Sequence, residues 1–253
     1  MAHRSSLPSD SAAQTAELLR RAVDRSGRIT AVAGRDLCAQ GGKPPLLAAA
    51  DPWRDLRPDQ LATPEAFARD PKQVWEWYAW QRELAAQAAP GPAHRVLAEI
   101  EGRADHFALI TESIDGLHQR AGSRAVIELR GSLWRLRCEK EGALFTDTRV
   151  PVPELPPRCT CGAPLRPDVV WYGEAVPQEV VEEALEAATN CDLLLAVATS
   201  GLTQPAISLP IAAKRAGATA VEINPEPTRI SWAMDALLRG RPEEVLPRLW
   251  PPG

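Results

Sequence analysis

The sequence predicts an α/β protein with a doubly wound parallel sheet and a small inserted module. Four short apolar runs have the character of strands buried on both faces, at residues 107–111, 125–129, 193–199 and 218–223. Helical patterns lie between some of them, at residues 178–189 and 205–216. This alternation is typical of a parallel sheet covered by helices, which binds ligands at the carboxyl ends of its strands. Residues 138–167 break the alternation, since they are rich in proline and hold three of the five cysteines.

The first part of the chain supplies further elements. Residues 11–24 have helical periodicity followed by a stop at Gly27, and residues 29–33 form a strand pattern that ends at Gly34. Residues 40–58 are rich in glycine and proline and should be irregular. Thr63 followed by Pro64 is a helix start. The aromatic stretch at residues 74–80 should be helical, and such stripes more often pack in a core than bind a ligand.

Composition narrows the class of protein. The 253 residues are 45% hydrophobic and 25% charged, which suits a globular chain with a substantial core. The net charge of -4 and the isoelectric point near 5.7 argue against nucleic acid as a partner. No stretch resembles a signal peptide or a membrane span, so we expect a cytoplasmic protein. Five cysteines fit reduced thiols or a metal site better than a disulfide scaffold.

Five segments together resemble the sirtuin (Sir2) family. They are residues 63–71 (TPEAFARDP), 114–123 (IDGLHQRAGS), 128–138 (ELRGSLWRLRC), 165–174 (LRPDVVWYGE) and 221–228 (VEINPEPT). Any one of them is weak evidence, but all five occur in the family's order and at family-like spacing. The resemblance covers most of the chain from about residue 29 onward.

The resemblance implies a Rossmann-like domain with a smaller zinc-ribbon-like and helical domain. On this basis the Rossmann-like domain comprises residues 1–39, 104–137 and 168–253, and the small domain comprises residues 40–103 and 138–167. It also implies a cleft between the two for NAD and an acyl-lysine peptide. We therefore expect a nucleotide or an acylated peptide as the partner.

Two segments near the expected phosphate and nicotinamide sites depart from the family. The family's Gly-Ala-Gly turn reads Gly34-Arg35-Asp36 here, which places a carboxylate near the expected pyrophosphate, although Arg35 can pair with phosphate. The family's Thr-Phe-Arg segment is replaced by residues 45–47 (PLL), so its arginine is lost. From these two changes we expect NAD to bind weakly.

The nicotinamide pocket differs too. The family's Thr-Gln-Asn-Ile-Asp reads TESID at residues 111–115, which keeps Asp115 and replaces both amides with Glu112 and Ser113. The largest departure is Arg130, at a position where the family has a histidine that acts as general base on a ribose hydroxyl. A guanidinium has no lone pair and stays protonated, so Arg130 cannot take that role. His94, His106 and His118 have the pattern of structural residues and offer no replacement.

The segments that resemble substrate-binding and adenosine-binding parts of the family are better kept. Tyr78 matches the tyrosine of the acyl-selecting pair in desuccinylase-type enzymes, whereas Gln81 stands in place of its arginine, and the neighbouring Arg82 points about a quarter turn further round the helix. The peptide-binding loop matches at Val170, Trp171, Tyr172, Gly173 and Glu174. The adenosine side matches at Thr199, Ser200 and Asn224, with Ala198 in place of a glycine.

The family's zinc site is altered. Its two Cys-x-x-Cys pairs become Cys138 with Glu141, and Cys159 with Cys161. Zinc accepts thiolate and carboxylate ligands. A Cys-x-Cys pair is nevertheless expected to have a poor bite for one ion, so a metal-free module is an equally good interpretation and zinc is expected to be absent or substoichiometric.

Three hypotheses remain open. The first is a sirtuin-like binding or regulatory protein without efficient deacylation. The second is a repurposed enzyme in which Asp36, Glu112, Asp115 and Arg130 form a new charged pocket. The third is a residual NAD-dependent protein-lysine deacylase. The missing base and glycines favour the first two hypotheses over the third.

Overall fold

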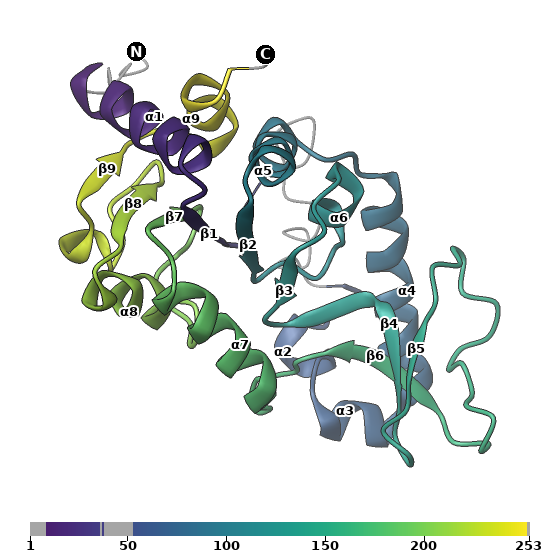
Figure 1. Ribbon diagram of the computed structural model, residues 1–253. Helices are drawn as coiled ribbons and strands as arrows, with labels where there is room; N and C mark the ends of the chain where they lie inside the picture. The colour runs from purple at the N-terminus through teal and green to yellow at the C-terminus, as the bar shows by residue number, and fades with distance from the viewer. Residues whose placement is uncertain (1–8, 36, 38–52, 252–253) are drawn as a thin grey trace.

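The architecture comes from a computed structural model that describes residues 9–35, 37 and 53–251 (Figure 1). The α-helices of this part are α1 Ser9–Asp24, α2 Pro58–Leu61, α3 Pro64–Arg69, α4 Pro71–Gln87, α5 Pro92–Arg103, α6 Leu117–Ala121, α7 Gln178–Thr189, α8 Ser208–Ala216 and α9 Pro242–Leu249. The strands are β1 Arg28–Ala33, β2 His106–Thr111, β3 Val126–Glu128, β4 Gly131–Cys138, β5 Leu144–Thr146, β6 Leu165–Val169, β7 Leu193–Val197, β8 Thr219–Ile223 and β9 Ala236–Leu238. No helix of the described residues is long and apolar enough to cross a membrane.

The larger sheet is parallel throughout and has the order β3-β2-β1-β7-β8-β9. The two central strands, β1 and β7, are apolar apart from Thr30 and the exposed first residue Arg28, because both of their faces are covered. Alternate residues point to opposite faces, so Ala31 and Leu195 contact a core shared with α1, α5 and α9. Val32 and Leu194 contact the core beneath α7 and α8. The predicted doubly wound α/β fold is therefore confirmed.

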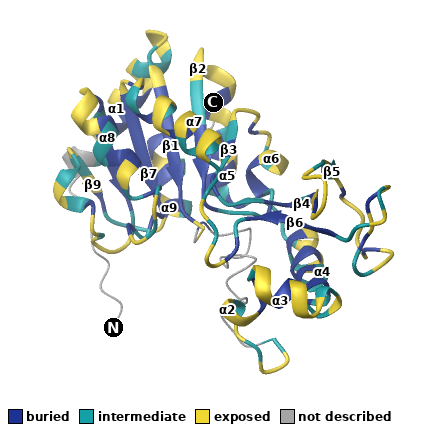
Figure 2. Ribbon diagram, turned by 90° about the horizontal axis from the view of Figure 1, so that it is seen from below, coloured by how far each residue is buried: buried dark blue, intermediate teal, exposed yellow. Residues whose placement is uncertain are grey.

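A second hydrophobic core holds the smaller unit together. An antiparallel sheet of order β5-β4-β6 packs with α2, α3 and α4 (Figure 1). The aromatic helix α4 supplies Trp75, Trp77 and Tyr78 to this core, and the Trp75 indole donates a hydrogen bond to the Leu165 carbonyl at 2.7 Å. The unit is assembled from two stretches of chain, residues 53–87 and 131–169. Figure 2 shows its buried interior beside that of the larger sheet.

Several local predictions hold and others need adjustment. Thr63 caps α3 by accepting the Ala66 amide at 3.0 Å, and α7 spans the predicted residues. Helix α5 packs against the core of the larger sheet, although it lies within the range that the sequence assigns to the small domain. The predicted irregular segment at residues 40–58 and the segment at residues 45–47 lie wholly or largely outside the described residues.

Two buried histidines, His94 and His118, pack against each other. The rings of His94 and His118 lie 4.7 Å apart between α5 and α6. Among the described residues, neither ring nitrogen of His118 has a hydrogen-bond partner. Burial lowers the pKa of His94 to about 4 and lowers that of His118 well below its usual value. Both rings are therefore neutral in the folded protein at neutral pH.

This pair predicts a loss of stability in mild acid. The unfolded chain takes up protons below about pH 6.5, whereas the folded His94 does so only near pH 4. The stability that neutral histidines contribute is thus present above pH 6.5 and falls as the pH drops, by up to about 3 kcal/mol for His94 alone. Urea unfolding at pH 7.5 and pH 5 should show this loss in the wild type.

The double variant His94→Asn with His118→Leu should lose less stability between the two pH values. The exposed His106→Gln variant is the control and should behave as the wild type does. An equal loss in the double variant would show that other groups cause the acid sensitivity.

Candidate functional site

The site lies where the strand order of the large sheet reverses. From β1 the chain builds outward through β2 to β3, and it returns as β7 on the other side of β1. The carboxyl ends of β1 and β7 therefore flank the crevice in which doubly wound folds bind ligands. Gly34 follows β1 and its amide donates to the Val197 carbonyl at 2.9 Å. A Cβ atom on Gly34 would lie 2.0 Å from the Ala198 carbonyl oxygen, just after β7. This close backbone contact is sufficient to require glycine at position 34.

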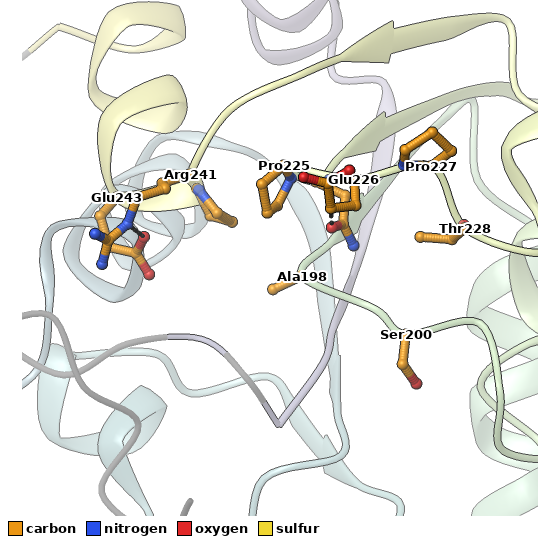
Figure 3. A pocket seen from close by; sticks show the side chains of 10 residues that line it. Ala198, Ser200, Pro225, Glu226, Pro227, Thr228, Arg241 and Glu243 are labelled. Carbon is orange, nitrogen blue, oxygen red and sulfur yellow. Dashed lines mark hydrogen bonds and ion pairs between the residues drawn. The ribbon is translucent and has the colours of Figure 1, made fainter. Parts of the chain in front are cut away.

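A cavity of about 290 Å³ opens beside this contact (Figure 3). Ala198 and Ser200 line it from the segment after β7, residues 224–228 line it from the segment after β8, and Arg241, Pro242 and Glu243 close its far side. It is mixed in character, since it combines proline rings with a serine hydroxyl and the carboxylate of Glu226. A carboxylate at the end of a strand in this fold is suited to bind ribose hydroxyls.

Asn224 holds this cavity in shape. Its side-chain amide donates to the Thr199 carbonyl at 2.8 Å, which ties the segment after β8 to the segment after β7. Beneath it, the fully buried Glu222 accepts hydrogen bonds from Arg239 at 2.8 Å and from the hydroxyls of Thr228 and Ser231. Glu222 therefore fixes the segment that carries the cavity wall.

The other predicted nucleotide-binding residues are placed differently. Thr199 is buried, and its hydroxyl has no hydrogen-bond partner among the described residues. It supports the cavity from behind, whereas Ser200 lines it. The Arg35 side chain is exposed at the turn after β1, and Asp36 lies outside the described residues.

Arg130 and Glu112 meet at the carboxyl ends of β3 and β2. The Arg130 guanidinium donates to the Gln204 carbonyl at 2.9 Å and lies 3.9 Å from the Glu112 carboxylate. Glu112 also accepts a hydrogen bond from the Thr203 hydroxyl, and its amide donates to the Ala33 carbonyl at 3.0 Å. This network joins the ends of β1, β2 and β3 to the loop that follows β7.

Asp115 does not join this charged pair. Its carboxylate is buried and accepts the Leu117 amide at 2.9 Å, which caps the start of α6. Burial raises the pKa of Asp115, although hydrogen bonds from the Leu117 amide and Ser113 partly oppose the shift. Ser113 itself donates its amide to the Thr111 hydroxyl at 3.0 Å. Of the four residues suggested for a new charged pocket, the described structure thus brings only Glu112 and Arg130 together.

The loop after β6 is clamped by Arg166. Its guanidinium binds both oxygens of Glu174, at 2.6 and 2.8 Å, and stacks 3.2 Å from the centre of the Trp171 ring. Burial alone would raise the pKa of Glu174, but hydrogen bonds from Arg166 and from the Trp171 amide outweigh it and lower the pKa. The amides of Val170, Trp171, Tyr172 and Glu174 all donate within the chain. Tyr172 and Gly173 are the exposed residues of this loop.

Tyr78 lies beneath the same loop. Its hydroxyl accepts the Trp171 indole N–H at 2.8 Å, and burial raises its pKa, so it is neutral. Gln81 is also buried, and its amide nitrogen has no hydrogen-bond partner among the described residues. Arg82 is turned to the other side of α4, where it binds Asp147, so it does not replace the missing arginine.

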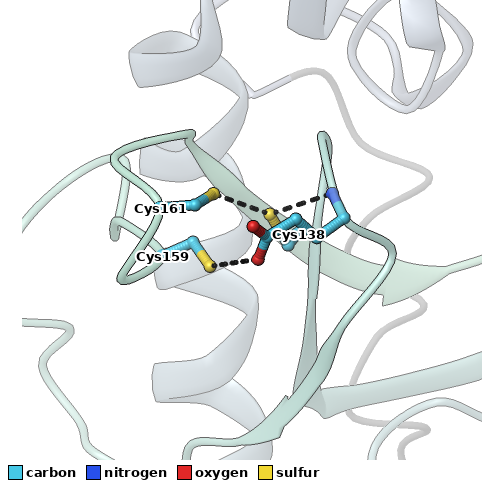
Figure 4. Close-up of side chains that lie close together, drawn as sticks. Cys138, Cys159 and Cys161 are labelled. Atoms are coloured by element: carbon cyan, nitrogen blue, oxygen red, sulfur yellow. Dashed lines mark hydrogen bonds between the residues drawn. The ribbon is translucent and has the colours of Figure 1, made fainter.

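The small unit also brings four possible metal ligands together. The sulfur atoms of Cys138, Cys159 and Cys161 and a carboxylate oxygen of Glu141 all lie within 4.8 Å of one another. The Cys-x-Cys spacing predicts that Cys159 and Cys161 cannot easily face one ion, but the structure brings both sulfur atoms to the same cluster (Figure 4). This donor set fits a tetrahedral zinc ion, since zinc binds both sulfur and carboxylate oxygen.

The sequence model of the Sir2 family matches residues 48–205. This chain belongs to the Sir2 family. The chain is 49% identical over 217 residues to NAD-dependent protein deacylase 2 of Pyrobaculum aerophilum. This alignment covers 85% of this chain and 87% of the relative. It is 44% identical to the NAD-dependent protein deacylase of Aquifex aeolicus over 82% of this chain and 87% of that one.

A solved Sir2 homologue in complex with NAD has a similar fold. Its TM-score is 0.81 at 39% identity, and the match covers 92% of this chain and 91% of that chain. The fold and family of a NAD-dependent deacylase are thus shown for this protein, and so is the predicted Rossmann-like architecture with its smaller domain.

Sequence reasoning missed several residues of the site. Thr203 and Gln204, which bind Glu112 and Arg130, lie in the loop after β7, where the only signal was their position after a strand end. Arg166 lies eight residues before its partner Glu174 within the segment 165–174, and the only signal for their ion pair is an arginine and a glutamate in one short segment. Arg241 and Glu243 lie too far along the chain for any local pattern to place them at the cavity.

Ala198 gives a test of this geometry. Its φ of 52° lies in the left-handed region, which favours glycine, and its side chain lines the cavity. Ala198→Gly should therefore raise the free energy of unfolding by about 0.5–1 kcal/mol, because relief of strain exceeds the added chain entropy. Ala196→Gly, in the buried middle of β7, is the control and should destabilise. Urea unfolding that shows Ala198→Gly to be as destabilising as the control would contradict the assigned conformation.

Proposed function

We propose that this protein is a Sir2-family nucleotide-binding protein that deacylates lysine slowly or not at all. The observation that carries the proposal is the Arg130–Glu112 pair. By resemblance, Arg130 stands where the family has its general base, and a guanidinium bound to a carbonyl oxygen and a carboxylate offers no acceptor for a proton. Loss of a general base reduces a rate by about 10²–10⁴.

The nucleotide part of the proposal rests on the cavity beside Ala198. It is preformed, because Asn224 and Glu222 hold its walls through hydrogen bonds within the chain. Its serine hydroxyl and the Glu226 carboxylate suit the hydroxyls of a ribose, while its proline rings suit the face of a base. We expect the adenosine half of NAD to bind here and the nicotinamide half to add little affinity, since Glu112 and Ser113 replace the family's amides.

A residual NAD-dependent protein-lysine deacylase is the second candidate. The Arg166 clamp on residues 170–174 favours it, because that loop resembles the peptide-binding loop of the family and is held by hydrogen bonds between Arg166 and Glu174. Its activity would have to proceed without a base at Arg130.

The first test compares turnover of acetyl-lysine and succinyl-lysine peptides with that of the Pyrobaculum aerophilum relative, measured as nicotinamide release. We expect a rate lower by about 10²–10⁴. Arg130→His alone should not restore it, because Ser113 and the changed residues 45–47 remain. Turnover equal to that of the relative would exclude the proposal in favour of the second candidate.

Calorimetry with NAD and with ADP-ribose tests the nucleotide site. We expect ADP-ribose to bind at least as tightly as NAD. Ser200→Tyr, which fills the cavity, should weaken ADP-ribose binding by about tenfold or more, equivalent to roughly 1.4 kcal/mol. Ser208→Tyr, on an exposed position of α8, is the control. Tight binding of NAD without binding of ADP-ribose would instead indicate a rebuilt nicotinamide pocket.

A further inference from the structure

A second cavity lies on the outer face of the small sheet. It has a volume of about 370 Å³, and no residue that lines it also lines the cavity beside Ala198. Strands β4, β5 and β6 form part of its wall, and the loop before α7 and the first turn of that helix form the rest. The cavity is therefore separate from the site proposed for the nucleotide.

Two arginines of β4 are fixed side by side in this cavity. Residues of a strand alternate between its faces, so Leu136 enters the core of the small unit while Arg135 and Arg137 point outward. The buried Asp168 carboxylate binds both of them. One of its oxygens accepts the Arg137 Nε–H at 2.8 Å, and the other accepts a hydrogen bond from the Arg135 Nε. One carboxylate thus holds two guanidinium groups next to each other without cancelling their combined charge.

The accessible part of this cluster is positive. The side chains of Arg135 and Arg137 are 35% and 45% exposed, whereas those of Asp168 and Glu128 are only 6% and 13% exposed. The contacts with these two carboxylates use Nε and Nη1 of Arg135 and Nε and Nη2 of Arg137. Within the described part of the chain, Nη2 of Arg135 and Nη1 of Arg137 therefore keep N–H donors for a ligand.

Arg166 lines the same cavity but does not add to this free charge. It lies directly opposite Arg137 in register, and two like charges in such a pair destabilise a sheet unless they are compensated. Glu174 supplies the compensation, since its carboxylate binds the Arg166 guanidinium through both oxygens. The Arg166 side chain is also only 10% exposed. A ligand in the cavity would therefore meet Arg135 and Arg137 first.

The rest of the wall decides which anion fits. It is largely apolar and includes Leu144, Val169, Val170, Ala175, Pro177 and Val180. The exposed Glu179 also lines the cavity and would repel a ligand with two negative charges more strongly than a ligand with one. Apolar surface beside a pair of guanidinium groups suits a single carboxylate attached to a short hydrocarbon chain.

We propose that Arg135 and Arg137 bind the carboxylate of a small organic acid, whose hydrocarbon chain lies against the apolar wall at Val169 and Val180. The fork of a guanidinium matches a carboxylate through two parallel hydrogen bonds. A volume of about 370 Å³ falls in the range of small-molecule sites. The inference is independent of the proposed function, because it involves neither the nucleotide cavity nor Arg130.

Hexanoate is a suitable probe of this cavity. It is titrated into the isotope-labelled full-length protein at constant ionic strength, and the amide signals of Val169, Val170 and Val180 are followed by NMR. We expect these signals to shift saturably. Arg135→Gln and Arg137→Gln should each weaken hexanoate binding by about tenfold or more, because each removes a charged donor of the carboxylate. Arg158→Gln removes an exposed arginine of the small unit outside the cavity and should bind hexanoate as the wild type does.

A second variant blocks the site from within the chain. Leu144 is 54% exposed and lies directly opposite Arg137 in register. Leu144→Glu therefore places a carboxylate within reach of the free Arg137 N–H groups without disturbing the core, so it remains informative if an arginine variant fails to fold. This variant should lose hexanoate binding, whereas the uncharged Leu144→Gln should keep most of it.

Three results would overturn the proposal. The first is the absence of saturable shifts with hexanoate, or shifts that are unchanged in both arginine variants and in Leu144→Glu. The second is binding of hexanol as tight as that of hexanoate, because the apolar wall would then act without the arginines. The third is binding of inorganic phosphate as tight as that of hexanoate, because charge alone would then select the ligand.

Discussion

The contact between the ends of β1 and β7 is the constraint on which the rest of the site depends. Gly34 donates its amide to Val197 and leaves no room for a side chain against Ala198. This close approach accompanies the left-handed conformation of Ala198, from which the chain continues into Ser200 and the loop that reaches Arg130. This one backbone contact between neighbouring parallel strands therefore positions the cavity wall at Ala198 and the start of the loop that reaches Arg130.

The polar groups behind the cavity differ from those beside Arg130 in how they are satisfied. Behind the cavity wall, the buried Glu222 accepts hydrogen bonds from Arg239, Thr228 and Ser231, whereas the buried Thr199 hydroxyl has no partner among the described residues. At the ends of β2 and β3, Arg130 and Glu112 face each other and the loop after β7. A ligand that replaced these partners would have to compensate for the interactions that Arg130 and Glu112 make with each other and with this loop. This difference supports the proposal that a ligand binds at the cavity and that little chemistry takes place at Arg130.

The fold class could be predicted from the sequence because strands buried on both faces of a parallel sheet are uninterrupted apolar runs, as β7 is. It also singled out Arg130 and Tyr78, since each lies within a recognisable segment, and their roles stay predictions. It could not show that Asp115 turns toward α6, because side-chain direction at the end of a strand depends on contacts far along the chain. Nor could it show the meeting of Glu141 with Cys159 and Cys161. Spacing alone suggested that Cys159 and Cys161 could not easily face one ion. The structure instead brings both of their sulfur atoms within 4.8 Å of the other two possible ligand atoms.

The small unit is assembled from two separate stretches of the chain, with α5, β2 and β3 of the larger unit between them. No single contiguous fragment of the gene therefore encodes it, and no single proteolytic cut releases it. Its core forms only when β4 and β6 have been brought back against α4, across more than 40 residues that form α5, β2, α6, β3 and the loops between them. The chain therefore passes from one unit to the other more than once. Recombination that exchanges one of them for that of a relative would have to replace two segments at once.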